Sequence, residues 1–68
     1  MTPTVLNLAK LRREAGLSQM ELAELAGCQQ ATISHLETGK SKRIELSLLD
    51  RLAEVLECNP KDLIMKKD

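Results

Sequence analysis

The 68-residue chain contains no phenylalanine, tyrosine or tryptophan. Its core must therefore be built from Leu, Ile, Val, Ala, Met and Cys side chains. The lack of aromatic rings also argues against RNA as a partner, because proteins commonly hold RNA by stacking its bases on such rings. A chain of this length predicts one small domain, over residues 1–68, which buries only about 60% of the surface exposed in its unfolded state.

Long apolar runs are also missing. No stretch approaches the ~18 consecutive apolar residues required to span a membrane, and residues 1–7 lack the basic start and apolar segment of a signal peptide. Hydrophobic residues make up 43% of the chain and charged residues 29%, a balance that favours a globular over a disordered chain. We therefore expect a soluble, cytoplasmic protein that has no membrane partner.

Cysteine and histidine are scarce, with two cysteines and one histidine. A disulfide between Cys28 and Cys58 is not expected in a cytosolic chain, and a single histidine is too few to complete a metal site. Both cysteines are interpreted as small buried hydrophobic residues. Without paired carboxylates or an activated thiol, the sequence argues against an enzyme and predicts no metal and no other cofactor. No small-molecule ligand is evident either.

The chain has no net charge, with ten basic and ten acidic residues. DNA-binding domains are often basic, so this balance argues against nucleic acid and predicts weak non-specific binding. The distribution of charge softens the objection, because Lys40, Lys42 and Arg43 lie within four residues and residues 10–13 carry a second basic group. A local basic patch can bind phosphates while the remaining surface is acidic.

Residues 18–38 predict two short helices joined by a glycine turn. Ser18 can cap the first helix and Glu21, three residues later, completes a capping box. Gly27 stands where the chain needs a positive φ to leave that helix. Apolar residues then return at Ile33 and Leu36, on one face of a second helix over about 29–38.

Three further helices are predicted, which makes an all-α fold of five short helices with no strand. Apolar residues at helical spacing indicate helices at Thr4–Ala15 and Ile44–Glu57. Asn59 and Pro60 then start a short last helix, with proline at its first position. Its apolar residues divide into Leu63, which is expected in the core, and Ile64 and Met65, for which a partner surface is an alternative.

The outward face of the helix over 29–38 carries small and polar side chains and no Leu, Ile or Val. A glutamine amide can pair with N6 and N7 of adenine in the major groove, and an alanine methyl can contact the methyl group of thymine. A helix about 10–12 Å across also matches the groove, which is about 12 Å wide. The predicted DNA-binding residues of this helix are Gln29, which is a poor N-cap, Gln30, Ala31, Ser34, His35 at the rim, and Thr38.

The stretch SQMELAELAGCQQATISHLETGK resembles the helix-turn-helix of the Cro and phage-repressor (XRE) family of prokaryotic regulators. The likeness extends from about Leu8 to Ile64 and implies a compact, lambda-repressor-like DNA-binding domain. It also implies that Arg12 and Glu37 form a structural ion pair, which would lock the first helix to the third. A direct phosphate contact is the alternative role for Arg12. The matching features are Gln19, Leu22-Ala23, Gly27, Ile33 and Leu36–Lys40.

The resemblance implies a transcriptional regulator that binds double-stranded DNA sequence-specifically, as a homodimer on a palindromic operator. Gln30 is the best candidate for a base contact, whereas His35 could reach either a base or a phosphate. Gln19 is expected at a phosphate, with a solvated position as the alternative. A protein-interaction module, such as the antitoxin half of a toxin–antitoxin pair, is the second functional hypothesis. The expected phosphate contacts of the loop after the helix are Lys40, Lys42 and Arg43.

Overall fold

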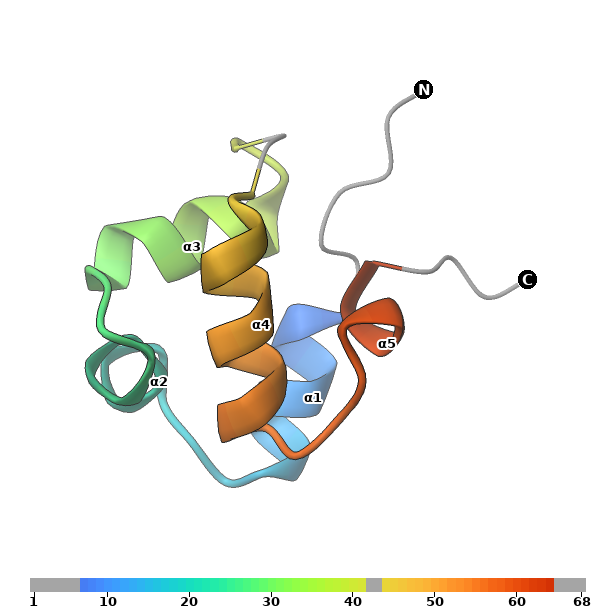
Figure 1. Ribbon diagram of the computed structural model, residues 1–68. Coiled ribbons are helices and arrows are strands. Elements are labelled where there is room, and N and C mark those ends of the chain that lie inside the picture. The colour runs from blue at the N-terminus through green and yellow to red at the C-terminus, as the bar shows by residue number, and fades with distance from the viewer. Residues whose placement is uncertain (1–6, 42–43, 65–68) are drawn as a thin grey trace.

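The computed structural model describes residues 7–41 and 44–64. In these ranges the chain forms helices and no strand, which confirms the predicted fold class (Figure 1). No helix within them is long and apolar enough to cross a bilayer. The helices are α1 (Leu8–Glu14), α2 (Gln19–Ala26), α3 (Gln30–Thr38), α4 (Leu46–Val55) and α5 (Pro60–Ile64).

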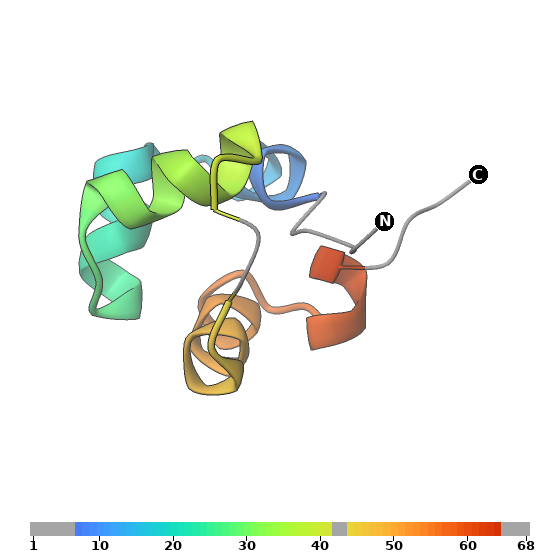
Figure 2. The same cartoon turned by 90° about the horizontal axis from the view of Figure 1, so that it is seen from above.

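The core lies between two groups of helices. Seen from above, α1, α2 and α3 lie on one side, and α4 and α5 lie on the other (Figure 2). Each helix contributes at least one aliphatic side chain that is almost completely removed from solvent. Because aromatic residues are absent, this aliphatic cluster supplies most of the hydrophobic stabilisation. Its most buried members are Leu8, Leu22, Ile33, Leu52 and Leu63.

Two helices are shorter than the sequence predicts. The first helix was expected from Thr4 but begins at Leu8, after Asn7, and residues 4–6 lie outside the described ranges. The helix expected at Ile44–Glu57 spans only Leu46–Val55. Ile44 precedes that helix yet still packs against the core, so its place in the apolar pattern reflects burial rather than helical backbone.

The first four helices are each followed by a residue in the left-handed conformation. Gly16, Gly27 and Gly39 follow α1, α2 and α3 with φ of 74°, 74° and 80°. The corresponding position after α4 is Glu57, the one non-glycine residue with positive φ (55°) among residues 7–41 and 44–64. A side chain with a Cβ is disfavoured there by roughly 1–2 kcal/mol. The end of α4 therefore carries backbone strain that the three glycine-terminated helices avoid.

The start of α1 is bonded to α5. The backbone N–H of Asn7 donates to the carbonyl oxygen of Leu63 (3.3 Å), and the Asn7 side-chain amide donates to the carbonyl oxygen of Asp62 (2.7 Å). Figure 1 shows these two ends of the described chain side by side. The last helix is thus attached both to α4, on which it packs, and to the beginning of α1.

Candidate nucleic-acid interface

The start of α2 is fixed by the predicted capping box. The Ser18 hydroxyl accepts a hydrogen bond from the backbone N–H of Glu21 (3.0 Å), and the Glu21 carboxylate accepts one from the backbone N–H of Ser18 (2.8 Å). At the other end, Gly27 turns the chain, and the N–H of Cys28 donates to the carbonyl oxygen of Ala23 (2.9 Å). Both ends of α2 are therefore satisfied by the chain itself.

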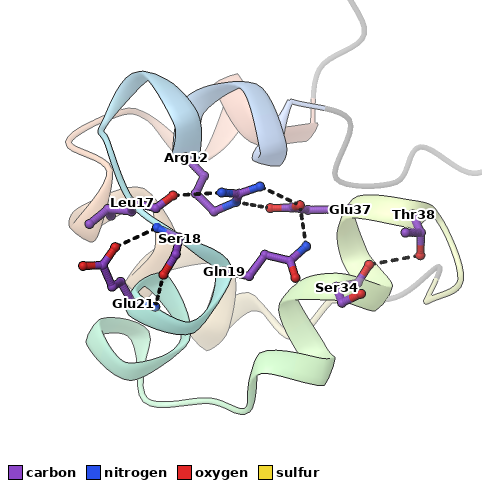
Figure 3. A network of polar contacts seen from close by, with 8 residues as sticks. All are labelled: Arg12, Leu17, Ser18, Gln19, Glu21, Ser34, Glu37 and Thr38. Atoms are coloured by element: carbon purple, nitrogen blue, oxygen red, sulfur yellow. Dashed lines mark hydrogen bonds and ion pairs between the residues drawn. The ribbon is translucent and has the colours of Figure 1, made fainter.

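The carboxylate of Glu37 joins three helices, as Figure 3 shows. Arg12 of α1 donates from Nε to Glu37 Oε2 (2.6 Å) and from Nη2 to Oε1 (3.2 Å). Gln19, the first residue of α2, donates from Nε2 to Oε1 (2.9 Å). The Arg12 and Glu37 side chains are only 12% and 6% exposed. The structural ion pair implied by the resemblance is confirmed, and it fixes α3 against α1 and α2.

The charges of this pair are stabilised in the folded protein. Burial alone would raise the pKa of Glu37, but the hydrogen bonds from Arg12 and Gln19 outweigh it and lower that pKa. The hydrogen bond to Glu37 raises the pKa of Arg12, against the opposing effect of burial. Both groups are therefore ionised at neutral pH, and Arg12 also donates from Nη1 to the carbonyl oxygen of Leu17 (2.8 Å).

Gln19 has a structural role that the sequence did not reveal. Its side chain is half-buried, and its amide nitrogen donates to Glu37. An amide nitrogen carries two hydrogens, so this bond leaves one N–H to the phosphate contact that the sequence predicts. No local sequence signal could have revealed the bond, because its partners are separated by 18 positions and meet only through the packing of α2 on α3.

The two faces of α3 differ in their surroundings. Ile33 and Leu36 are buried on the inner face. Of the predicted DNA-binding residues, Ser34 is half-buried and the Thr38 hydroxyl donates back to the carbonyl oxygens of Ser34 (3.0 Å) and His35 (3.4 Å). Such back-bonding turns a hydroxyl toward its own helix. Apart from Ser34, the predicted residues of the helix are all exposed: Gln29, Gln30, Ala31, His35 and Thr38.

The first turn of α3 is open. Its N-cap is Gln29, in extended conformation, and within the described residues no side chain caps this helix end. The predicted poor cap is confirmed, and the helix begins at Gln30. Backbone N–H groups at such an end, together with the helix dipole, favour a bound anion.

The basic loop after α3 is only partly described. Lys40 is exposed, and the backbone N–H of Ser41 donates to the carbonyl oxygen of His35 (3.1 Å), so the chain folds back against the end of the helix. The predicted contacts Lys42 and Arg43 lie outside the described residues. The position of Lys40 places one positive charge just beyond the C-terminal end of α3.

The cysteines lie at the edge of the core. Cys28 and Cys58 are free and pack against the hydrophobic cluster as expected of small hydrophobic residues, but they are half-buried rather than buried. Burial raises the pKa of the Cys28 thiol, more than the nearby Arg51 lowers it. Burial and the charge of Asp62 both raise the pKa of Cys58. Neither thiol is therefore activated as a nucleophile. In the described part of the chain, no three His, Cys, Asp or Glu residues are grouped as metal ligands.

Residues 7–66 match the family model of the Cro/C1-type HTH DNA-binding domain. The chain belongs to this family. Its similarity to the uncharacterized HTH-type transcriptional regulator YozG of Bacillus subtilis (strain 168) agrees, with 35% identity over 60 residues that cover 88% of this chain and 71% of YozG. The predicted membership in a family of helix-turn-helix, DNA-binding transcriptional regulators is confirmed.

Solved structures of Cro/C1-type domains share the fold. SinR of Bacillus subtilis, the master regulator for biofilm formation, in complex with DNA, is 28% identical with a TM-score of 0.80, over 84% of this chain and 90% of that chain. The restriction-modification controller protein C.AhdI of Aeromonas hydrophila is 33% identical with a TM-score of 0.79, over 85% of this chain and 86% of that one.

Proposed function

We propose that this chain acts as one domain that binds double-stranded DNA sequence-specifically, with α3 in the major groove. The exposed outer face of α3, held in place by its buried inner face and by Glu37, is the observation that carries this function. A helix fixed from behind in this way presents its outer side chains with little loss of conformational entropy on binding. The similarity to SinR, whose structure was solved in complex with DNA, supports DNA as the ligand.

Base reading is assigned to the first turn of α3. Gln30 and Ala31 are exposed there, and N-terminal residues of a recognition helix contact base edges. The Gln30 amide pairs with adenine, and the Ala31 methyl suits a thymine methyl. His35, one turn further and also exposed, reaches a base or a phosphate at the edge of the groove. Ser34 and Thr38 complete this face with shorter reach, because Ser34 is half-buried and the Thr38 hydroxyl bonds back to its own helix.

Phosphate contacts are assigned to groups on either side of that face. Gln19 and the open first turn of α3, including Gln29, supply N–H donors at one side. Lys40, with Lys42 and Arg43, supplies positive charge at the other. Since these contacts do not read bases, replacing Lys40 with Ala should weaken binding to all sequences alike and reduce the salt slope by about 1.

A second copy of the chain is needed to recognise a site long enough to be specific. One α3 helix reads only a few base pairs, and helix-turn-helix proteins commonly solve this with a two-fold dimer whose half-sites lie about 34 Å apart. We therefore include a homodimer and a palindromic operator in the proposed function.

The test begins with selection of duplexes from a random pool by the purified protein. Enrichment of a short palindrome is expected. Gln30→Ala is then assayed against every single-base variant of the selected duplex, with Glu54→Gln, an exposed change on α4, as the control. We expect Gln30→Ala to lose about 1–3 kcal/mol of discrimination at one symmetric pair of positions. Uniform weakening at all positions would contradict base reading by Gln30.

A further inference from the structure

A groove of about 430 Å³ lies between the C-terminal ends of α1 and α4 and beside the C-terminal half of α2. Aliphatic side chains form most of its wall. Leu11 and Leu17 line it from the α1 side, and Val55 and Leu56 line it from α4. All four are only half-buried, although they pack against the core. The groove therefore combines aliphatic side chains at the edge of the core with polar atoms at the surface.

Leu25 adds exposed apolar surface to the rim of this groove. It lines the groove from α2 and is 61% exposed. A single exposed leucine is common on protein surfaces, but one that adjoins a groove of half-buried aliphatic residues marks a binding surface. Leu46 provides the contrast, since it is 77% exposed and does not line the groove.

The charged residues that line the groove have one sign. They are Glu14 of the α1 end and Glu57 of the α4 end, and the other described lining residues are uncharged. Two carboxylates beside an apolar surface favour a partner that carries lysine or arginine next to its apolar side chains. This charge pattern also disfavours the acidic phosphates of nucleic acid.

Glu57 is also the strained residue of the backbone. It occupies the left-handed position in which the three other helix ends carry glycine. Glycine adopts positive φ readily and would remove that strain. A carboxylate at a strained position, on the wall of this groove, points to a role for that side chain in binding.

The groove is separate from the proposed DNA-binding face. Its described lining residues come from α1, α2, α4 and the turns after α1 and α4. In Figure 1 the C-terminal ends of α1 and α4 lie together at the foot of the molecule, whereas α3 crosses its upper part. Occupation of the groove is thus compatible with DNA bound at the outer face of α3.

We propose that this groove docks a helical segment of another protein, in which leucine-like side chains are flanked by lysine or arginine. Leu25 and the aliphatic wall bury the apolar side chains of the segment, and Glu14 and Glu57 pair with its basic residues. This is the helix-in-groove mode of peptide recognition. A DNA-binding domain with such a second surface can carry a partner protein to its operator.

The first experiment uses a short amphipathic peptide of leucine and lysine that carries one tryptophan. Because the protein has no aromatic residue, tryptophan fluorescence anisotropy reports the peptide alone. We expect binding that perturbs the backbone amide NMR signals around the groove, and much weaker binding of the same peptide with glutamate in place of lysine. Equal binding of both peptides, or signal changes that centre on another surface, would overturn the proposal.

Variants then locate the site. Leu25→Gln should weaken peptide binding about tenfold, whereas the matched change Leu46→Gln should alter it less than about twofold. The double variant Glu14→Gln/Glu57→Gln should weaken peptide binding by a similar factor and reduce the salt dependence of that binding. The double variant Glu45→Gln/Asp50→Asn removes the same number of charges outside the groove and is the control. Equal effects of the paired variants would contradict the assignment. Circular dichroism and melting curves confirm that each variant is folded.

Two further measurements distinguish a partner protein from a second copy of this chain in the groove, and groove binding from DNA binding. If the wild-type protein is a dimer and Leu25→Gln makes it a monomer, the groove holds a second copy and the proposal is wrong. The peptide is assayed without DNA, so its binding does not depend on the proposed operator. We expect Leu25→Gln to bind the selected duplex as tightly as wild type does, and a loss there would assign the groove to DNA binding instead.

Discussion

The two helices of the DNA-binding motif follow each other in the chain and have eight and nine residues, but they are held in different ways. Helix α2 is satisfied at its start by the Ser18–Glu21 capping box and at its end by the turn at Gly27. Helix α3 is held by its inner face and by Glu37, while within the described residues its first turn has no side-chain cap. The two helices thus differ in how their backbone ends are satisfied. The chain bonds the polar groups at both ends of α2 to itself, whereas in the described structure the start of α3 has no side-chain cap.

The largest change should come from the inner face of α3. Ile33→Ala should lower the free energy of unfolding by about 2–5 kcal/mol, because it empties space in a core that has no aromatic residue to fill it. Chemical denaturation measures the loss. Gln30→Ala, on the outer face of the same helix, should change stability by less than about 0.5 kcal/mol. Similar losses for both variants would mean that α3 does not have one buried and one exposed face.

Removal of the carboxylate that joins the helices should have the next largest effect. Glu37→Ala leaves Arg12 half-buried without its partner and should cost about 1.5–3 kcal/mol. DNA binding should weaken mainly through the loss of fold. A variant with wild-type stability and no DNA binding would instead make Glu37 part of the interface.

The same carboxylate predicts a pH dependence. The pKa of Glu37 is lower in the folded than in the unfolded state, so its stabilising effect is complete above the unfolded value of about 4.3. That effect should be lost as the pH falls through the lower, folded pKa. Unfolding curves of wild type and Glu37→Ala should therefore converge in acid. A gap that stayed constant down to pH values well below 4 would contradict an ionised pair.

The capping box of α2 gives a smaller and more local effect. Ser18→Ala should cost about 1 kcal/mol, because the backbone N–H of Glu21 loses its acceptor. Thermal unfolding measures this loss, and Ser47→Ala, an exposed serine inside α4, serves as the control. An equal effect of both changes would remove the contrast between a capped and an uncapped helix.

The smallest effect should be a gain. Gln29→Ser supplies α3 with the side-chain cap that it lacks in the described structure and should raise stability by about 0.5–1 kcal/mol. Thermal unfolding is again the measurement. No gain would show that the N–H groups of this first turn are already satisfied by solvent at little cost.

Much of this fold could be predicted from the sequence, because the signals are local. Helical spacing of apolar residues located the five helices, and Ser18, Glu21 and Gly27 fixed the ends of α2. The helix after the basic loop was predicted too long, since apolar Ile44 continues the pattern although its backbone does not. The C-terminal end of this helix was also predicted wrongly, because Glu57 adopts the left-handed conformation that glycine usually signals in a sequence.

The candidate site was predictable in outline only. The exposed face of α3 follows from its sequence, and the Arg12–Glu37 pair followed from the family resemblance. The bond from Gln19 to Glu37 and the back-bonded hydroxyl of Thr38 depend on distances between side chains in the folded chain. Periodicity does not specify such distances. Nor could it show that Leu25 adjoins a groove built from two other helices.

The hydrogen bonds from Asn7 to the backbone of α5 hold the first and last helices next to each other in space. The fold therefore does not require that these two helices stand at opposite ends of the chain. A short flexible linker could join the ends of the described chain, and the turn between α4 and α5 could be opened in its place. Such a circular permutant would run from α5 through α1 to α4 and would retain the same core. It would also move both chain ends to the turn that follows α4, which offers a different point of attachment for any domain fused to this one.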